Sequence, residues 1–593
     1  MSTDNPFLSH VAALSPVLLL EIQKPPPVPS DTPTMSQDLD RYSIVVLVVF
    51  ALSICLVVRP LSIPLPRSLR LPWRNANSPP LRIHIGTLTS PLAAVLLLWA
   101  STCISSRVVR DGIVGVDGIK PYSILILFLS LAYMAISLDI TGVFQAAAFW
   151  VSNKGGSSGW RLYLYFYLML TGFGILVGND PVVLSGTVFL VYWTEAAGVD
   201  QTAWLFAEFA AANTASMVLF VGNITNVVIC EGLGITNIAY TAYTIFPFLA
   251  CSILCYAALA FQFRNTGSIP KVMPEVARLD PRSALVDPVG AVVGTIIFAA
   301  CLVVLLGVSF VDTEVWEITL PFAGAKFVFD LVWDYWRFTR RRALQEATPA
   351  AGAVQEKGDN RVPRKIDDCD PSDDECSCRK VPISPQVFPA NDPTSATLEL
   401  PQVEEQTKTD RWKWVRERWP TIIAAVPRLP FALVPFTFCQ FMLIEALAYR
   451  GWIRVFARWL QIASGGHPYP VLLLVGVLGV LLCNVSGTNI GATVLLTKVL
   501  RAARLSRNAS VAGAIALAIS SNIGAVSFVF SASLAGLLWR TILKQKGIVI
   551  RQMDFAKWNM LPLFAMTVAG LGVACAELAV IMRADLAGSG QGF

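Results

Sequence analysis

The sequence contains few charged residues and very little histidine. Asp, Glu, Lys and Arg make up 15% of the 593 residues, and hydrophobic residues make up 54%. Soluble chains carry about 25% charged residues. The three histidines are His10, His84 and His467, and we expect no proton relay from them. The composition therefore predicts a polytopic membrane protein.

Several functional signatures are also missing. The sequence has no basic stripe interleaved with aromatic residues and no zinc-finger spacing, so nothing points to nucleic acid. It has no G-x-x-x-x-G-K-[ST] loop, and any drive by ATP must come from a partner. The 12 cysteines give no spacing typical of a secreted disulfide framework. We expect no enzyme activity, no cofactor and no metal site.

The apolar pattern divides the chain into two membrane halves. Residues 1–40 lack the basic start and apolar run of a signal peptide, and they resemble a disordered Pro/Ser-rich tail. Apolar stretches then predict a first membrane half over 41–335 and a second over 420–593. Residues 336–419 are too hydrophilic to fold alone, and we expect a disordered loop there. Arginines after the first span and at the start of this loop place both on the cytoplasmic side.

Polar, glycine-flanked interruptions break the apolar sequence in both halves. The first half contains GNDP at 178–181 and GNITN at 222–226, and the second contains CNVSGTNIG at 483–491 and SSNIG at 520–524. Bilayer hydrocarbon cannot satisfy loose backbone groups or carboxamides, so such breaks survive only where they line an enclosed cavity. Matching breaks in two halves point to the binding site of a transporter.

The interruptions supply the candidate site residues. Asn179 offers a donor and an acceptor, Asp180 a charge, and Pro181 favours the start of a helix. A helix that begins there presents its positive end to an anion or an oxygen-rich solute, whereas Asp180 itself suits a cation or a proton. The candidates are Gly178, Asn179, Asp180, Asn223, Thr225, Asn226, Thr488, Asn489, Ser521 and Asn522.

A structural role remains open for each of these residues. Asp180 could only cap the helix that follows it, and the asparagines could bond between helices without touching a ligand. Glu195, Glu208, Glu231 and Glu445 are expected at span ends or in pairs rather than as proton carriers. In the central loop, Cys369, Cys376 and Cys378 could bind a soft ion, but their acidic surroundings favour disorder.

The interruptions and their flanks resemble the arsenical pump membrane permease family of the ion transporter superfamily. GNDPVVLSGTVFLVY is similar to its first hairpin tip, AANTASMVLFVGNITNVV to its first broken helix, and GTNIGATVLL and SSNIGAVSFVFSASLAGLLWRTILKQKG to the second pair. The resemblance covers about residues 80–265 and 425–582. Two positions depart from the family pattern: Ser527 to Phe530 replaces a Thr-Pro turn, and Thr488 to Gly491 lacks a proline.

The resemblance implies an all-α polytopic fold of about 10–12 spans. It implies two inverted repeats, each with a re-entrant hairpin and a broken helix, around a midplane site. It further implies proton-coupled export of a small inorganic anion or hydroxide, such as arsenite, across the plasma membrane, the vacuolar membrane or another internal membrane. The superfamily also contains sodium/proton antiporters and citrate or dicarboxylate carriers, and a homodimer is possible. A membrane scaffold that acts through the central loop is the alternative from another class.

Overall fold

The computed structural model of the chain describes residues 39–64, 82–116, 118–273, 280–307, 314–347, 412–431 and 433–589. The expected N-terminal tail lies outside these ranges apart from its last two residues. The three cysteines of the central loop, Cys369, Cys376 and Cys378, also lie outside them. The chain divides into two units, Met1–Lys326 with Ala425–Phe593 and Phe327–Ala424. In the smaller unit, Asp334 accepts hydrogen bonds from the backbone and the hydroxyl of Thr421.

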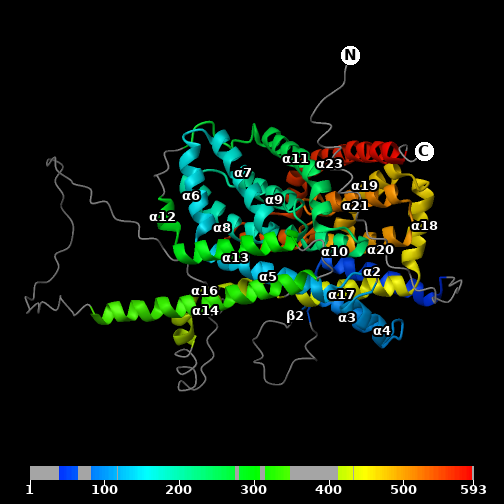
Figure 1. The fold of residues 1–593 in the computed structure, drawn as a ribbon, viewed down its shortest axis with the longest axis horizontal. Coiled ribbons are helices and arrows are strands. Elements are labelled where there is room, and N and C mark those ends of the chain that lie inside the picture. Colours follow the sequence, from blue (N-terminus) through cyan, green and yellow to red (C-terminus); the bar gives the residue numbers. More distant parts are fainter. Residues whose placement is uncertain are drawn as a thin grey trace, which may run out of the picture. The chain divides into compact units, whose positions relative to one another are not determined.

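The described chain is almost entirely helical, which confirms the predicted all-α polytopic fold (Figure 1). One short antiparallel pair interrupts it, formed by β1 (Leu61–Pro64) and β2 (Arg82–Ile85). Within the described ranges, eight helices are long and apolar enough to cross a membrane. The expected count of about 10–12 spans also included hairpin arms and broken helices, most of which fall short of that length or hydropathy.

The same order of elements occurs in both halves. The first series is α5 (Pro121–Ile140), α6 (Val143–Gly155), α7 (Gly159–Val177), α8 (Asn179–Ala197), α9 (Thr202–Ala215), η2 (Phe220–Gly222), α10 (Ile224–Leu233) and α11 (Asn237–Phe263). The second is α17 (Leu433–Tyr449), α18 (Trp452–Ser464), α19 (Pro468–Val485), α20 (Asn489–Ala502), α21 (Arg507–Ile523), η5 (Phe530–Ala532), α22 (Leu534–Gln545) and α23 (Gln552–Ser589). The inversion of one series relative to the other stays a prediction.

The remaining helices precede or connect these two series. They are α2 (Arg41–Val58), α3 (Thr89–Ala100), α4 (Ser106–Val114), α12 (Pro281–Ala284), α13 (Pro288–Gly307), α14 (Val315–Ala347), α16 (Pro420–Ala425) and η4 (Val426–Arg428).

Small structural details repeat along with the order of elements. Helices α6 and α18 each contain 13 residues and follow a left-handed glycine, Gly142 at φ 86° and Gly451 at φ 85°. Helices α11 and α23 each contain an internal proline, Pro247 and Pro562. Since a left-handed turn and a helix proline are both unusual, their shared positions support one structural unit used twice.

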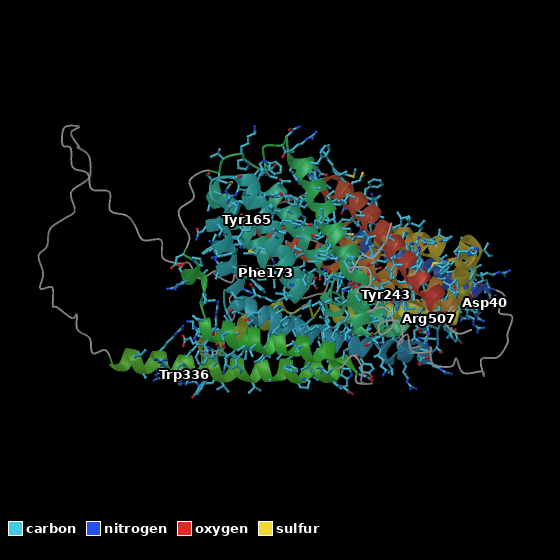
Figure 2. The ribbon with its side chains drawn as sticks, turned by 45° about the horizontal axis from the view of Figure 1, so that its top comes forward. Asp40, Tyr165, Phe173, Tyr243, Trp336 and Arg507 are labelled. Atoms are coloured by element: carbon cyan, nitrogen blue, oxygen red, sulfur yellow. The ribbon has the colours of Figure 1, made fainter. Side chains whose placement is uncertain are left out.

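The two halves share one apolar core. Helix α8 packs against α22 and α10 packs against α20, so each broken helix meets the hairpin of the other half. Helix α11 packs against α23 (Figure 1). Aromatic rings pack the hairpin arms within a half. Phe173, which Figure 2 shows on α7, lies with its ring centroid 4.6 Å from that of Phe144 on α6.

Glycine allows the first hairpin tip to contact the first broken helix. After α9 the chain leaves the helical path, forms the short turn η2, and resumes as α10. A Cβ atom on Gly222 would lie 2.4 Å from the Ser216 carbonyl oxygen, and one on Gly178 would lie 2.8 Å from the Gly222 carbonyl oxygen. Gly178 also has φ +84°, which only glycine adopts readily. Side chains are therefore excluded where tip and break meet.

The second hairpin carries a buried ion pair. Lys498 Nζ of α20 lies 2.7 Å from Glu445 Oε2 of α17, and the two side chains are 8% and 15% exposed. An ion pair in such surroundings stabilises the contact between α17 and α20 only while both partners are present, because either charge alone remains buried and uncompensated.

We expect Gly222→Ala to destabilise the protein by about 1–3 kcal/mol, as overpacking does. Gly172→Ala in α7 is the matched control, because a Cβ there meets nothing within 4 Å. Thermal unfolding in detergent, followed by tryptophan fluorescence, measures both. Equal melting temperatures for the two variants would contradict the close contact at Gly222.

We expect Glu445→Gln alone to destabilise the protein by about 3–5 kcal/mol. The double variant Glu445→Leu/Lys498→Met should regain most of that loss, because it removes both charges together. The same unfolding assay compares the two. A double variant less stable than the single one would show that the pair has another role.

Candidate functional site

A small pocket lies where four helices begin. Its empty volume is about 250 Å³. It is lined by Phe128, Asn179, Asp180, Asn223, Ile224, Asn489, Ile490, Ser533, Leu534 and Ala535. Apart from Phe128 of α5, these residues are the caps or first residues of α8, α10, α20 and α22. Each half therefore contributes one hairpin tip and one broken helix.

The four helix starts give the pocket a positive character. The first turn of a helix leaves backbone N–H groups without intrahelical partners, and the helix dipole adds partial positive charge there. Three of the starts are capped by side chains: Asn223 accepts from the Thr225 N–H, Thr488 from the Gly491 N–H, and Ser533 from the Gly536 N–H. Helix α8 follows Gly178, which has no side chain to cap it.

Asp180 is the one carboxylate among the residues that line this pocket. It lies in the first turn of the uncapped helix α8 and is half-buried. Among the described residues, no hydrogen bond or ion pair engages its side chain. An acidic residue is favourable at a helix start, and Asp180 lines the pocket.

Asn489 offers an unpaired acceptor to the same pocket. Its side chain is 2% exposed, and its amide nitrogen donates to the Ser521 carbonyl at 3.3 Å. Its Oδ1 atom has no hydrogen-bond partner within the described chain. A buried acceptor left unpaired costs about 1–3 kcal/mol. A solute hydroxyl or a cation at the pocket would satisfy it.

Asn522 connects the two broken helices. Its Oδ1 accepts from Ser216 Oγ at 3.0 Å and from Asn223 Nδ2 at 3.3 Å. Its Nδ2 donates to Asn226 Oδ1 at 2.7 Å, and Asn226 in turn donates to the Ser216 and Leu219 carbonyls. These bonds satisfy the backbone of the first break and hold Asn223 at the pocket wall.

The candidates from the sequence fall into two groups. Asn179, Asp180, Asn223 and Asn489 line the pocket, and Asn179 also donates to Asn213 Oδ1 at 3.1 Å. The others lie beside it and bond to the breaks or cap the helices: Gly178, Thr225, Asn226, Thr488, Ser521 and Asn522. Ligand contact by any of them stays a prediction.

The sequence-based candidates did not include Ser533, which lines the pocket as the cap of α22. The spacing between the halves could have found it. Asn179 and Asn489 both begin hairpin helices and lie 310 positions apart (489 − 179), and Asn223 plus 310 gives Ser533. A serine ahead of an apolar run is also a typical helix cap.

The acidic residues outside the pocket differ in their surroundings. Glu445 pairs with Lys498, and Glu195 is exposed at the end of α8. Glu231 accepts from the Lys120 backbone N–H at 3.3 Å. Glu208 is fully buried and bonds only to neutral donors.

Comparison with known proteins supports this architecture. Residues 80–343 match the family model of the citrate transporters, CitMHS. An arsenical pump membrane protein of Escherichia coli is 28% identical over 180 residues, which cover 30% of this chain and 41% of that protein. An uncharacterized transporter of Mycobacterium tuberculosis is 24% identical over 195 residues, covering 32% and 45%. The chain thus spans less than half the length of these curated relatives.

The solved structure of the Alcanivorax borkumensis YdaH transporter aligns with 91% of this chain and 99% of its own, at 9% identity and a TM-score of 0.41. A score this low does not establish a common fold. The helices that can cross a membrane and the family match together give the conclusion. The chain is a multi-pass integral membrane protein whose residues 80–343 match the family model of the CitMHS citrate transporters.

Proposed function

We propose that this protein is a secondary active transporter that exports a small inorganic anion or hydroxide, such as arsenite, in exchange for protons. The observation that carries the proposal is the convergence of four helix starts and one carboxylate on a single small pocket. The names of the Escherichia coli relatives support the class of solute.

The pocket chemistry suits a small, oxygen-rich solute. Helix starts bind anions and oxygen atoms through free N–H groups. Asn489 Oδ1 and the Asp180 carboxylate add acceptors for the hydroxyl groups of the solute. Arsenite is an uncharged hydroxide near neutral pH. Its oxygen atoms can accept hydrogen bonds from the helix starts, and its hydroxyl groups can donate to Asn489 and Asp180.

Asp180 supplies a means of coupling. When it is ionised, its oxygens accept hydrogen bonds from the solute hydroxyls. When it takes up a proton, it loses part of that acceptor capacity, so protons and solute compete for the same place. Exchange across a membrane needs competition of this kind, because binding of a proton then releases the solute and binding of the solute releases the proton.

Citrate is the second candidate solute, because the matched family model is that of citrate transporters. No lysine or arginine is among the residues that line the pocket, so a citrate carrier would depend on helix starts or a co-bound cation for charge balance. Sodium/proton antiport is a third possibility, with Asp180 and Asn489 Oδ1 as oxygen ligands. A homodimer also stays a prediction.

Replacing Asp180 by Asn should abolish coupling with little change in shape. In proteoliposomes with an imposed pH gradient, we expect arsenite flux through Asp180→Asn to fall at least about tenfold, within the range of ordinary coupling free energies. Glu195→Gln, on the exposed end of the same helix α8, is the matched control and should keep the flux.

The same vesicles identify the solute when arsenite, silicate, citrate and sodium are tested in turn. Flux of citrate or sodium in the absence of arsenite flux would overturn the choice of solute. Full flux through Asp180→Asn would overturn the site. If the protein transports none of the four solutes, the alternative function as a membrane scaffold is favoured.

A further inference from the structure

Glu208 lies in the middle of α9, one helix away from the pocket. Its side chain is fully buried. Both carboxyl oxygens contact Thr187 Oγ1 of α8, at 2.8 and 3.0 Å, and Oε2 also accepts from Trp539 Nε1 of α22 at 3.3 Å. The rings of Phe206 and Phe209 pack on Trp539, at 5.3 and 5.2 Å between centroids. The carboxyl group therefore has two neutral donors and an aromatic wall.

No cation balances this carboxyl group within the described chain. Helices α7, α8, α11, α21, α22 and α23 pack near α9. Their ionisable side chains include Tyr163 and Tyr167 on α7, Asp180 on α8, Cys255 on α11, Glu577 on α23, and the exposed Arg507 and Arg540 on α21 and α22. None of these side chains hydrogen-bonds to Glu208 or lies close enough to act on its charge. A buried carboxyl group without a cation is characteristic of a functional residue in a membrane protein.

The two helices that Glu208 joins both begin at the pocket. Helix α8 starts at Asn179 and α22 starts after Ser533, and both of these residues line it. Thr187 and Trp539 each lie further along the same two helices. A change in the charge of Glu208 alters its bonds to both, and so acts on the contact between the halves next to the pocket.

The second half shows that the fold does not require this carboxylate. With the spacing of 310, Thr187 corresponds to Thr497 (187 + 310) and Glu208 to Ala518 (208 + 310). Thr497 Oγ1 is buried without a hydrogen-bond partner in the described chain. The second half keeps the threonine and lacks the acid, although its helices follow the same order.

A second pocket brings open space close to Glu208. It has an empty volume of about 340 Å³ between α6, α7 and α8, and its wall includes Phe144, Phe173, Ser185 and Gly186 (Phe173 is labelled in Figure 2). A Cβ on Gly186 would lie 3.0 Å from Glu208 Oε1. Gly186 therefore lies between the Glu208 carboxyl group and this pocket.

We propose that Glu208 is a second proton-binding residue, distinct from Asp180, and that its protonation controls the contact between α8 and α22. A proton from water adds to one carboxyl oxygen and returns to water on release, so no other reactant is needed. As a carboxylate, Glu208 holds Thr187 and Trp539 together; as a neutral acid, it holds them less strongly. This role in coupling rests on the proposed transport function.

Infrared difference spectra between acid and neutral pH test the titration directly on the purified full chain in lipid. We expect a carbonyl band of a protonated carboxyl group that Glu208→Gln removes and Asp180→Asn leaves in place. Thr187→Val and Trp539→Phe each remove one donor and should shift that band. If Glu208→Gln does not fold, the band shifts in these two variants still test whether Glu208 carries the proton. This measurement is independent of the transported solute.

Flux then tests the coupling. In Glu208→Gln, arsenite efflux driven by a pH gradient should fall about tenfold, whereas arsenite exchange at equal pH falls by less than about twofold. Equal loss in both modes would make Glu208 a purely structural residue. A carbonyl band that persists in Glu208→Gln, or that neither Thr187→Val nor Trp539→Phe shifts, would overturn the proposal even if arsenite transport is confirmed.

Discussion

The hydrogen bonds of Asn522 are the interaction on which the pocket depends. A helix that is broken within a bilayer exposes carbonyl groups that lipid cannot satisfy. Here Asn226 binds the Ser216 and Leu219 carbonyls of the first break, and Asn522 holds Asn226 and Asn223 from the other half. The second half therefore supports the first break through Asn522, whereas Asn484, Gln552 and Asn559 of the second half bond to the backbone of the second break. The pocket lies beside this crossing, with one hairpin tip and one broken helix from each half in its wall.

Four of the ten residues that line the pocket could be predicted from the sequence, because the bilayer makes polar breaks conspicuous. Asn179, Asp180, Asn223 and Asn489 all stand within interruptions of apolar sequence, and all four line it. The direction of a carboxamide could not be predicted. Asn223 and Asn522 occupy similar glycine-flanked contexts, yet Asn223 lines the pocket whereas Asn522 points into the contact between the broken helices. That difference depends on where each helix resumes, which for the second break is after Ser533.

Glu208 shows a different limit of sequence reasoning. Its sequence surroundings, WLFAEFAAAN, suggest an acid at the end of a span or in a pair. The structure instead gives it two neutral partners, Thr187 and Trp539. They come from 21 residues upstream and 331 residues downstream. No local pattern encodes a contact between a hairpin arm of one half and the broken helix of the other. The spacing of 310 between the halves could have found the unequal pair Glu208 and Ala518, because it needs only the two aligned repeats.

The two halves share a scaffold and differ in their charges. Asp180 corresponds to Ile490 and Glu208 to Ala518, so the two acids proposed to bind protons have no acidic counterpart at the matching positions of the second half. In the second half, the corresponding hairpin helix α20 carries Lys498, whose charge is paired with Glu445. A buried ion pair is destabilised when either charge is removed, whereas a carboxyl group bonded to neutral donors has no opposite charge to lose. In the proposed mechanism, protonation of Glu208 therefore acts on the contact of α8 with α22, whereas an ion pair joins α20 to α17. The proposed exchange would therefore use one proton-sensitive contact and one ion-paired contact, built on two series of helices that follow the same order.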